Sequence, residues 1–487
     1  MQQSKLVKHI REMSSQERDR FSQFVYSPYF NQHRETRELL DVILTALDGS
    51  ASQLDRRRVF DRLYPGEEYE EQKLHNVMSY LKKLYHRFLA QEYFEQQPYE
   101  QSLCAIEAAY DSNRFTVFTN RAKFMEKTLR KEPVRDSQFH DARYRLNRML
   151  GYYRMSYVDR SRSTNMQVML DELDRYYIAE KLKHSCHLTA NTILMNTQYD
   201  FGFLDPLLDH IRRQWDDFQE DTSIVMYYTI LMSLREEDNN QHYLALKDML
   251  ASKTSMLSLE EARDLYAFSY NYCILQINKG NNDYKRELFQ LYRQGLKNEL
   301  LLSNGILSEW NYKNITTLGC SLKEFEWTES FIQEYKGLLP EHRQENAFNY
   351  NLANLYYHKE MYDQAIDLLQ RVQFTDVKYH LNSTFLLLRT YYELRDTEAL
   401  LSLIETFRIY IIRNRKMTTD QKRGWTNFLR FAKKLVLYKH QASTYTRGEL
   451  HEKLTDLSEK VEATTNIFNK HWLLAECRLE TTADAAG

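Results

Sequence analysis

Glycine and proline are scarce in this sequence of 487 residues, which contains 12 Gly and 6 Pro. Average usage would give several times as many of each. Turns with positive φ, sheet bulges and phosphate-binding loops need glycine, and long irregular loops usually contain proline. The shortage therefore argues against a sheet-rich fold and predicts a chain that is mostly helix.

Cysteine pairs and long apolar runs are lacking too. The cysteines occur singly, without a CxxC motif, at Cys104, Cys186, Cys273, Cys320 and Cys477. Single thiols are typical of reduced cytosolic proteins, so we expect a cytoplasmic protein without a disulfide framework. The N-terminal segment lacks the apolar core of a signal peptide, and no run of about 18 apolar residues occurs. We therefore expect no membrane among its partners.

A large excess of charge of one sign is also absent. The chain has 66 basic and 68 acidic residues, a net charge of −2, and 43% hydrophobic residues. This content is ample for a packed core and argues against general disorder. The near balance argues against a polyelectrolyte role for the whole chain, although local patches of charge are compatible with it.

The first hundred residues have the pattern of a compact helical unit, residues 1–100. Ser14 and Glu17 have capping-box spacing and predict a helix through about Val25. A longer helix is expected from about Glu70 to Phe94, with an apolar stripe at Leu74, Val77, Met78, Leu81, Leu84 and Phe88.

From about residue 101 the chain alternates between helical segments and short polar breaks. The breaks are expected at Arg130–Val134, Asp159–Asn165, Glu236–Gln241, Gly280–Asp283 and Met417–Gln421. This spacing is what stacked helical hairpins produce.

A repeat is clearest in Ala347–Asp376. A shift of 34 residues maps Leu352 to Leu386, Tyr357 to Tyr391, Ala365 to Ala399 and Leu369 to Leu403. A related pattern lies upstream in Thr317–Pro340, with Leu318-Gly319, Trp327 and Ser330. The later unit departs from the pattern, since Asp396 stands where the aromatic residue of the turn is expected.

This segment resembles a tetratricopeptide repeat (TPR). Leu352-Ala353, Tyr356, Tyr362 and Ala365 stand at the family's motif positions. The chain is also similar to uncharacterised bacterial helical-repeat proteins. The resemblance implies an all-α fold, a right-handed α-solenoid of TPR-like hairpins. The expected parts are the N-terminal helical unit (1–100), divergent hairpin repeats (101–305), TPR-like repeats (306–415), and a basic hairpin, capping helix over Leu450–Leu474 and frayed tail (416–487).

The same resemblance implies a function. First helices of TPR hairpins line a concave groove that binds an extended or helical segment. Asn351 and Asn354 match groove positions, where an Asn side chain can hold a peptide backbone. By spacing, Tyr350, Tyr357, Arg389 and Tyr392 lie on or beside that face. We therefore expect a non-catalytic scaffold or adaptor that binds a protein or peptide partner.

Catalytic and cofactor motifs are missing. GxxxxGK[ST], GxGxxG, HExxH, GxSxG and EF-hand loops do not occur, so neither an enzyme nor a cofactor is expected. His184, Cys186 and His187 suggest a metal site at first sight. On a helix Cys186 points away from the two histidines, so we expect no metal there.

Nucleic-acid binding is the alternative function, through either of two segments. Between 408 and 440 cations are interleaved with aromatic residues such as Tyr410 and Trp425, a combination that suits nucleic acid. The cations that we expect to bind it are Arg413, Arg415, Lys416, Lys422 and Arg423. The segment Val59–Leu89 is similar to the helix–turn–helix part of winged-helix regulators. That similarity would place Lys73, Asn76, Lys83 and Arg87 toward a DNA groove, although no wing follows in Gln91–Glu100.

Overall fold

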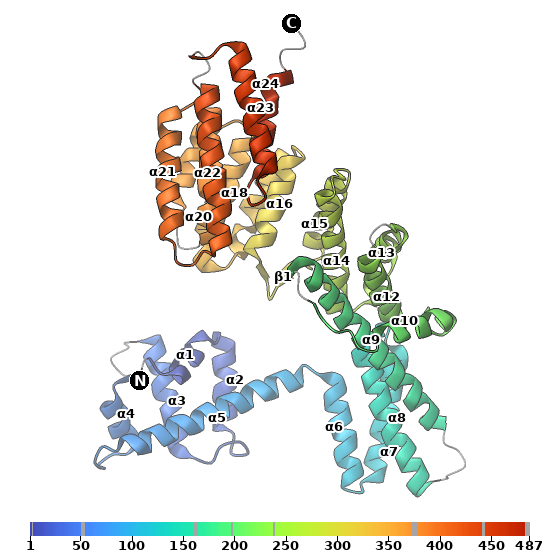
Figure 1. The fold of residues 1–487 in the computed structure, drawn as a ribbon. Helices are drawn as coiled ribbons and strands as arrows, with labels where there is room; N and C mark the ends of the chain where they lie inside the picture. Colours follow the sequence, from blue (N-terminus) through green and yellow to red (C-terminus); the bar gives the residue numbers. More distant parts are fainter. Residues whose placement is uncertain are drawn as a thin grey trace. The chain divides into compact units, whose positions relative to one another are not determined.

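The computed structural model describes residues 1, 3–49, 54–158, 164–195, 198–236, 239–372, 377–440 and 444–482, and helices dominate this part of the chain (Figure 1). Two compact units are present, unit 1 comprising Met1–His184 and Phe201–Ile224, and unit 2 comprising Ser185–Asp200 and Val225–Gly487. Helices α9 and α12 each contribute residues to both.

The helices before residue 225 are α1 (Lys5–Glu12), α2 (Ser15–Tyr26), α3 (Arg34–Asp48), α4 (Arg56–Leu63), α5 (Glu71–Glu95), α6 (Pro98–Asp111), α7 (Phe115–Lys131), α8 (Ser137–Tyr157), α9 (Thr164–Met195), α10 (Leu204–Arg213), α11 (Trp215–Phe218) and the start of α12 (Thr222–Arg235). The predicted capping box is confirmed, because Ser14 N–H donates to Glu17 Oε2 at 2.7 Å. The predicted helix from about Glu70 is α5.

The later elements are α13 (Gln241–Ser252), η2 (Thr254–Met256), α14 (Leu259–Asn278), α15 (Tyr284–Lys297), β1 (Leu302–Ser303), β2 (Ile306–Leu307), α16 (Glu309–Ser321), α17 (Phe325–Tyr335), η3 (Lys336–Leu338), η4 (Glu341–Arg343), α18 (Gln344–His358), α19 (Tyr362–Arg371), α20 (Val377–Glu393), α21 (Thr397–Arg413), α22 (Thr419–His440), α23 (Arg447–Ala463) and α24 (Lys470–Thr482). The antiparallel pair β1–β2 turns at Asn304-Gly305, both with positive φ. An Asn-Gly pair favours this hairpin turn.

One turn geometry recurs in four helical hairpins. Three residues connect α6 to α7, α16 to α17, α18 to α19 and α20 to α21. The middle residues, Asn113, Lys323, Glu360 and Arg395, have φ between 55° and 61°. In each turn the next N–H donates to the carbonyl five residues back, at 2.8–3.0 Å. These are the left-handed residue and the long-range bond of a Schellman motif, which satisfies carbonyls at the helix end.

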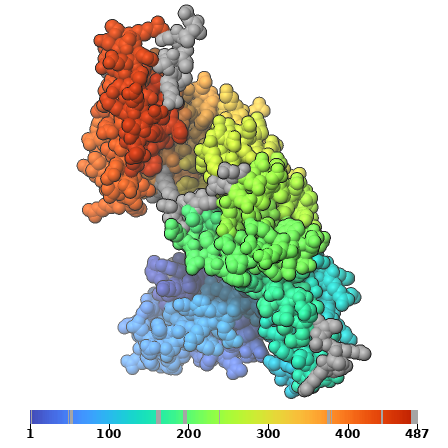
Figure 2. Space-filling view, turned by 45° about the vertical axis from the view of Figure 1, so that its right-hand side comes forward, coloured from blue at the N-terminus to red at the C-terminus, as the bar shows by residue number. Residues whose placement is uncertain are grey.

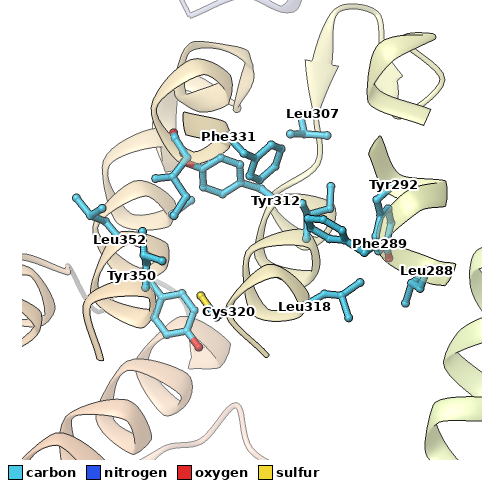
Figure 3. Close-up of a cluster of buried hydrophobic side chains, with 14 of the residues drawn as sticks. Leu288, Phe289, Tyr292, Leu307, Tyr312, Leu318, Cys320, Phe331, Tyr350 and Leu352 are labelled. Carbon is cyan, nitrogen blue, oxygen red and sulfur yellow. The ribbon is translucent and has the colours of Figure 1, made fainter. Parts of the chain in front are cut away.

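Helix α18 lies inside its neighbours. It packs against α16, α17, α19 and α20. Ala353 on α18 and Ala365 on α19 are both fully buried, so these two helices approach closely. Figure 3 shows the adjoining core, where the ring of Tyr312 lies beside Phe331 and Tyr350 lies beside Cys320. The Tyr312 hydroxyl donates to the Ile332 carbonyl at 2.6 Å, which ties α16 to α17.

The expected single capping helix over Leu450–Leu474 is wrong. The chain forms α23 and α24, separated by residues 464–469, and Asn469 has φ +52°. Asn466 Nδ2 donates to the Asp420 carbonyl at 3.0 Å, and Asn427 Nδ2 donates to the Asn466 carbonyl at 2.9 Å. Because the connection is bonded to α22, tertiary contacts replace the helical hydrogen bonds that the local sequence would otherwise form.

Candidate functional site

The residues expected to line a groove lie on α18 and α20, and most of them are buried. The exposed fraction is 0% for Asn351, 6% for Asn354 and 7% for Tyr350, Tyr357 and Tyr392. Arg389 is half-buried. The structure thus gives five of these six side chains a packing role, because neighbouring helices cover α18 and because Tyr392 on α20 packs against His440 and Trp472.

Asn351 is sealed within the core. Its Nδ2 donates to the Ala347 carbonyl one turn back at 2.8 Å. Its Oδ1 has no hydrogen-bond partner among the described residues. A partner on the surface therefore cannot reach the Asn351 amide in this conformation. The unpaired Oδ1 lowers the stability of the core, because a buried acceptor without a hydrogen bond is destabilising.

Arg389 provides a partly accessible charge. Its guanidinium carbon lies 4.5 Å from the centre of the Tyr357 ring and 5.8 Å from that of Phe385. The Tyr357 hydroxyl donates to Glu393 Oε1 at 3.1 Å, so the ring is held in place. No carboxylate of the described residues forms an ion pair with Arg389, and a cation over aromatic rings is partly stabilised without one.

Lys313 on α16 is a second cation that the sequence did not single out. Its ammonium lies 5.6 Å from the centre of the Tyr350 ring. Burial lowers the pKa of Lys313, and we find no ion pair for it in the part of the chain that is described. Burial raises the pKa of Tyr350, whereas the positive charge of Arg389 opposes that rise, so Tyr350 lies near both cations. Nothing in the local sequence distinguishes Lys313 from a solvated lysine.

These residues define what we call the α16–α18–α20 face: Lys313, Tyr350, Asn354, Tyr357, Phe385 and Arg389. Its chemistry is two half-buried cations against tyrosine rings, with Asn354 almost fully buried. Such a surface can hold a carboxylate by charge-assisted hydrogen bonds.

The proposed DNA-facing side of α5 is partly occupied by internal contacts. Lys73 forms an ion pair with Glu67, and its ammonium lies 3.9 Å from the centre of the Tyr64 ring. Asn76 Oδ1 accepts a hydrogen bond from a neighbouring glutamine. Lys83 is exposed, and the exposed Arg87 lies over the Phe30 ring at 5.4 Å.

No wing follows α5. Helix α5 continues to Glu95 and α6 begins at Pro98, with no strand in Gln91–Glu100. The structure therefore lacks the wing that a winged-helix regulator would need after α5.

The aromatic residues of 408–440 are mostly core. Trp425, Phe428 and Phe431 are between 0% and 6% exposed, as is Phe407 just before the segment, whereas Tyr410 and Tyr438 are half-buried. Arg413, Arg415, Lys416 and Arg423 are exposed, and Lys422 donates to the Ile412 carbonyl at 3.0 Å. Buried rings cannot stack on bases, so the cations and the two half-buried tyrosines are what this region offers to a nucleic acid.

The two histidines of the HSCH segment pair with different carboxylates. His184 Nε2 lies 3.2 Å from Glu180, and His187 Nε2 lies 3.3 Å from Asp264. Cys186 is fully buried, with its Sγ 3.2 Å from the Tyr227 carbonyl. The geometry does not bring the three side chains to one point.

Comparison with protein-family models, curated proteins and solved structures finds no match for this chain. Among the helices of the described residues, none is long and apolar enough to cross a bilayer.

Proposed function

We propose that this protein is a non-catalytic scaffold whose α16–α18–α20 face binds a carboxylate-bearing segment of a partner protein. One observation carries the proposal: Lys313 and Arg389 lie half-buried against Tyr350 and Tyr357, with no ion pair to either cation among the described residues. A half-buried cation has lost part of its hydration, so a carboxylate that pairs with it compensates that loss.

The proposed architecture is a right-handed α-solenoid of TPR-like hairpins in the cytoplasm. The recurring three-residue turn supports it, because one local geometry repeated along the chain is what hairpin repeats require. The middle residues of the last three turns, Lys323, Glu360 and Arg395, are spaced close to the 34-residue shift found in the sequence. Free thiols that are buried at Cys186, Cys273, Cys320 and Cys477 fit a reducing compartment.

The nucleic-acid alternative receives less support. Lys73 already pairs with Glu67, and Trp425, Phe428 and Phe431 near the C-terminal cations are buried. We therefore rank it below the peptide-binding proposal.

Selection from a displayed peptide library tests the proposal. Peptides selected by the full chain are expected to be enriched in Asp and Glu. Replacement of both cations, Lys313→Gln with Arg389→Gln, is expected to weaken the selected peptides about tenfold or more, because each charge-assisted bond is lost. The matched control, Lys247→Gln with Lys460→Gln, removes two exposed and ion-paired lysines of unit 2 and is expected to bind as the parent chain does. Selected peptides without acidic residues, or equal losses in both double variants, would refute the site.

A further inference from the structure

A second surface, at the end of α21 and the start of α22, combines exposed aliphatic side chains with exposed cations. Figure 1 shows α21 and α22 side by side, joined by a short connection. Ile409 is 44% exposed and Ile412 is 55% exposed. Because they are three residues apart on one helix, the two isoleucines share a face. We call this surface the α21–α22 tip, made of Ile409, Ile412, Arg413, Arg415, Lys416 and Arg423.

The charge of the tip is strongly positive. Asp420 is the only acidic residue between Arg408 and His440. The exposed cations Arg413, Arg415, Lys416 and Arg423 form no ion pair within the described parts of the chain. By contrast, Arg408 pairs with Glu405 at 3.0 Å, and Lys433 pairs with the same carboxylate at 2.9 Å.

The helix end accounts for only part of this charge. Carbonyl groups at the C-terminus of α21 favour nearby cations, and Lys422 donates to the Ile412 carbonyl. Arg413, Arg415, Lys416 and Arg423 are more cations than the C-terminus of α21 needs for capping. The connection that carries two of them is ordered, since the Asn414 side chain donates to the Tyr410 hydroxyl at 2.8 Å and accepts from the Lys416 N–H at 2.8 Å. The cations therefore stand on a fixed turn beside the isoleucines.

The exposed apolar side chains of the tip are aliphatic, and this favours a lipid surface over a nucleic acid as the partner. A single-stranded nucleic acid gains most from fully exposed aromatic rings, whereas Trp425, Phe428 and Phe431 are buried and Tyr410 and Tyr438 are half-buried. Exposed isoleucines gain nothing from phosphates, but they gain from leaving water at the boundary between lipid headgroups and acyl chains. Cations around them meet anionic headgroups in the same plane.

We propose that the α21–α22 tip binds the surface of an anionic lipid bilayer, without crossing it. The orange surface in Figure 2 includes α21 and α22, which carry the tip. The inference goes beyond the scaffold function and uses a different face, so either can fail alone. It departs from the expectation that no membrane is among the partners, because that expectation was drawn only from the lack of a signal peptide and of long apolar runs.

Vesicle flotation with the full chain tests the inference. Binding is expected to phosphatidylcholine vesicles that contain phosphatidylserine, to fall with added salt, and to be absent for phosphatidylcholine alone. Each cation at such a surface is worth about fivefold in partitioning. Arg413→Gln, Arg415→Gln and Lys416→Gln together are therefore expected to weaken binding by about a hundredfold, and Ile409→Ser with Ile412→Ser is expected to weaken it as well.

The matched control removes three exposed cations elsewhere, by Arg121→Gln, Lys123→Gln and Lys127→Gln on α7. It is expected to bind vesicles as the parent chain does, and circular dichroism verifies that all variants fold. The inference is overturned by no binding to the anionic vesicles, or by equal losses in the α7 control. It is also overturned if the isoleucine variant binds normally while an oligonucleotide binds through the same cations, because the surface is then a nucleic-acid site.

Discussion

Nδ1 of His140 lies 2.7 Å from Oε2 of Glu172, and both side chains are almost fully buried. The other oxygen of Glu172 lies 2.8 Å from Arg143 Nη1. On its far side, His140 Nε2 lies 3.8 Å from Asp221, which itself pairs with Arg175. This network connects α8, α9 and the residue before α12 within unit 1.

Removal of the central carboxylate is expected to destabilise unit 1. Glu172→Ala leaves His140 and Arg143 without their partner, and breaking a buried pair costs about 3 kcal/mol. Urea unfolding measures the loss. The control Glu180→Ala breaks an exposed pair with His184 and is expected to cost less than about 1 kcal/mol. Similar losses in both variants would show that the buried network contributes little.

The recurring turn offers a stabilising substitution. Glu360 has φ +61°, a conformation in which a Cβ atom is strained and glycine is not. We expect Glu360→Gly to raise the free energy of unfolding by about 0.5–1 kcal/mol, measured by urea unfolding. Glu360→Ala keeps the Cβ and removes the carboxylate, so its effect on stability measures the contribution of the charge without the relief of backbone strain. If Glu360→Ala stabilises equally, the turn strain is not the cause.

The close packing of Gly319 on α16 against Thr328 on α17 leaves no room for a side chain at position 319. A Cβ at position 319 would overlap Thr328 Oγ1, which donates to the Glu324 carbonyl at 2.7 Å. Gly319→Ala is therefore expected to cost about 1–3 kcal/mol by overpacking.

Thr328→Ala tests the cause of that loss. In a double-mutant cycle, it is expected to recover part of the stability lost in Gly319→Ala. Gly448→Ala is the control, because nothing lies within 4 Å of its Cβ. Additive effects at 319 and 328 would contradict the proposed overlap.

Acid is expected to weaken unit 2 through His380. Burial lowers the pKa of His380 to about 4, against an ordinary value of 6.5. The native state keeps this imidazole neutral while the unfolded chain binds a proton below pH 6.5. The contribution of the neutral His380 to the free energy of unfolding is therefore fully present above pH 6.5 and is lost as the pH falls toward 4.

Urea midpoints measured between pH 4 and pH 7 test this dependence. His380→Gln is expected to flatten the curve in that window, whereas His75→Gln, at an exposed position of unit 1, is expected to leave it unchanged. An unaltered slope in His380→Gln would show that other groups cause the loss.

The helical class and many boundaries follow from local signals. Scarce glycine and proline predict helix, and Ser14 with Glu17 marks the start of α2 as observed. The Asn304-Gly305 hairpin carried an equally local signal that our interpretation of the sequence did not use. By contrast, three of the four recurring turns have a charged residue with positive φ at the position where glycine is usual, and the fourth has Asn113. No local signal marks the three turns with a charged residue, whereas asparagine is often found in this conformation.

The sequence by itself determined that the chain is helical, since periodicity and turn chemistry act between residues a few positions apart. Only the tertiary structure decided which side chains are accessible. Asn351 has the spacing of a groove residue, yet the neighbours of α18 bury it, whereas Lys313 and Ile412 have no distinguishing motif and remain partly or largely exposed. Burial depends on which helices pack together, and that choice sums many distant contacts that no short segment encodes.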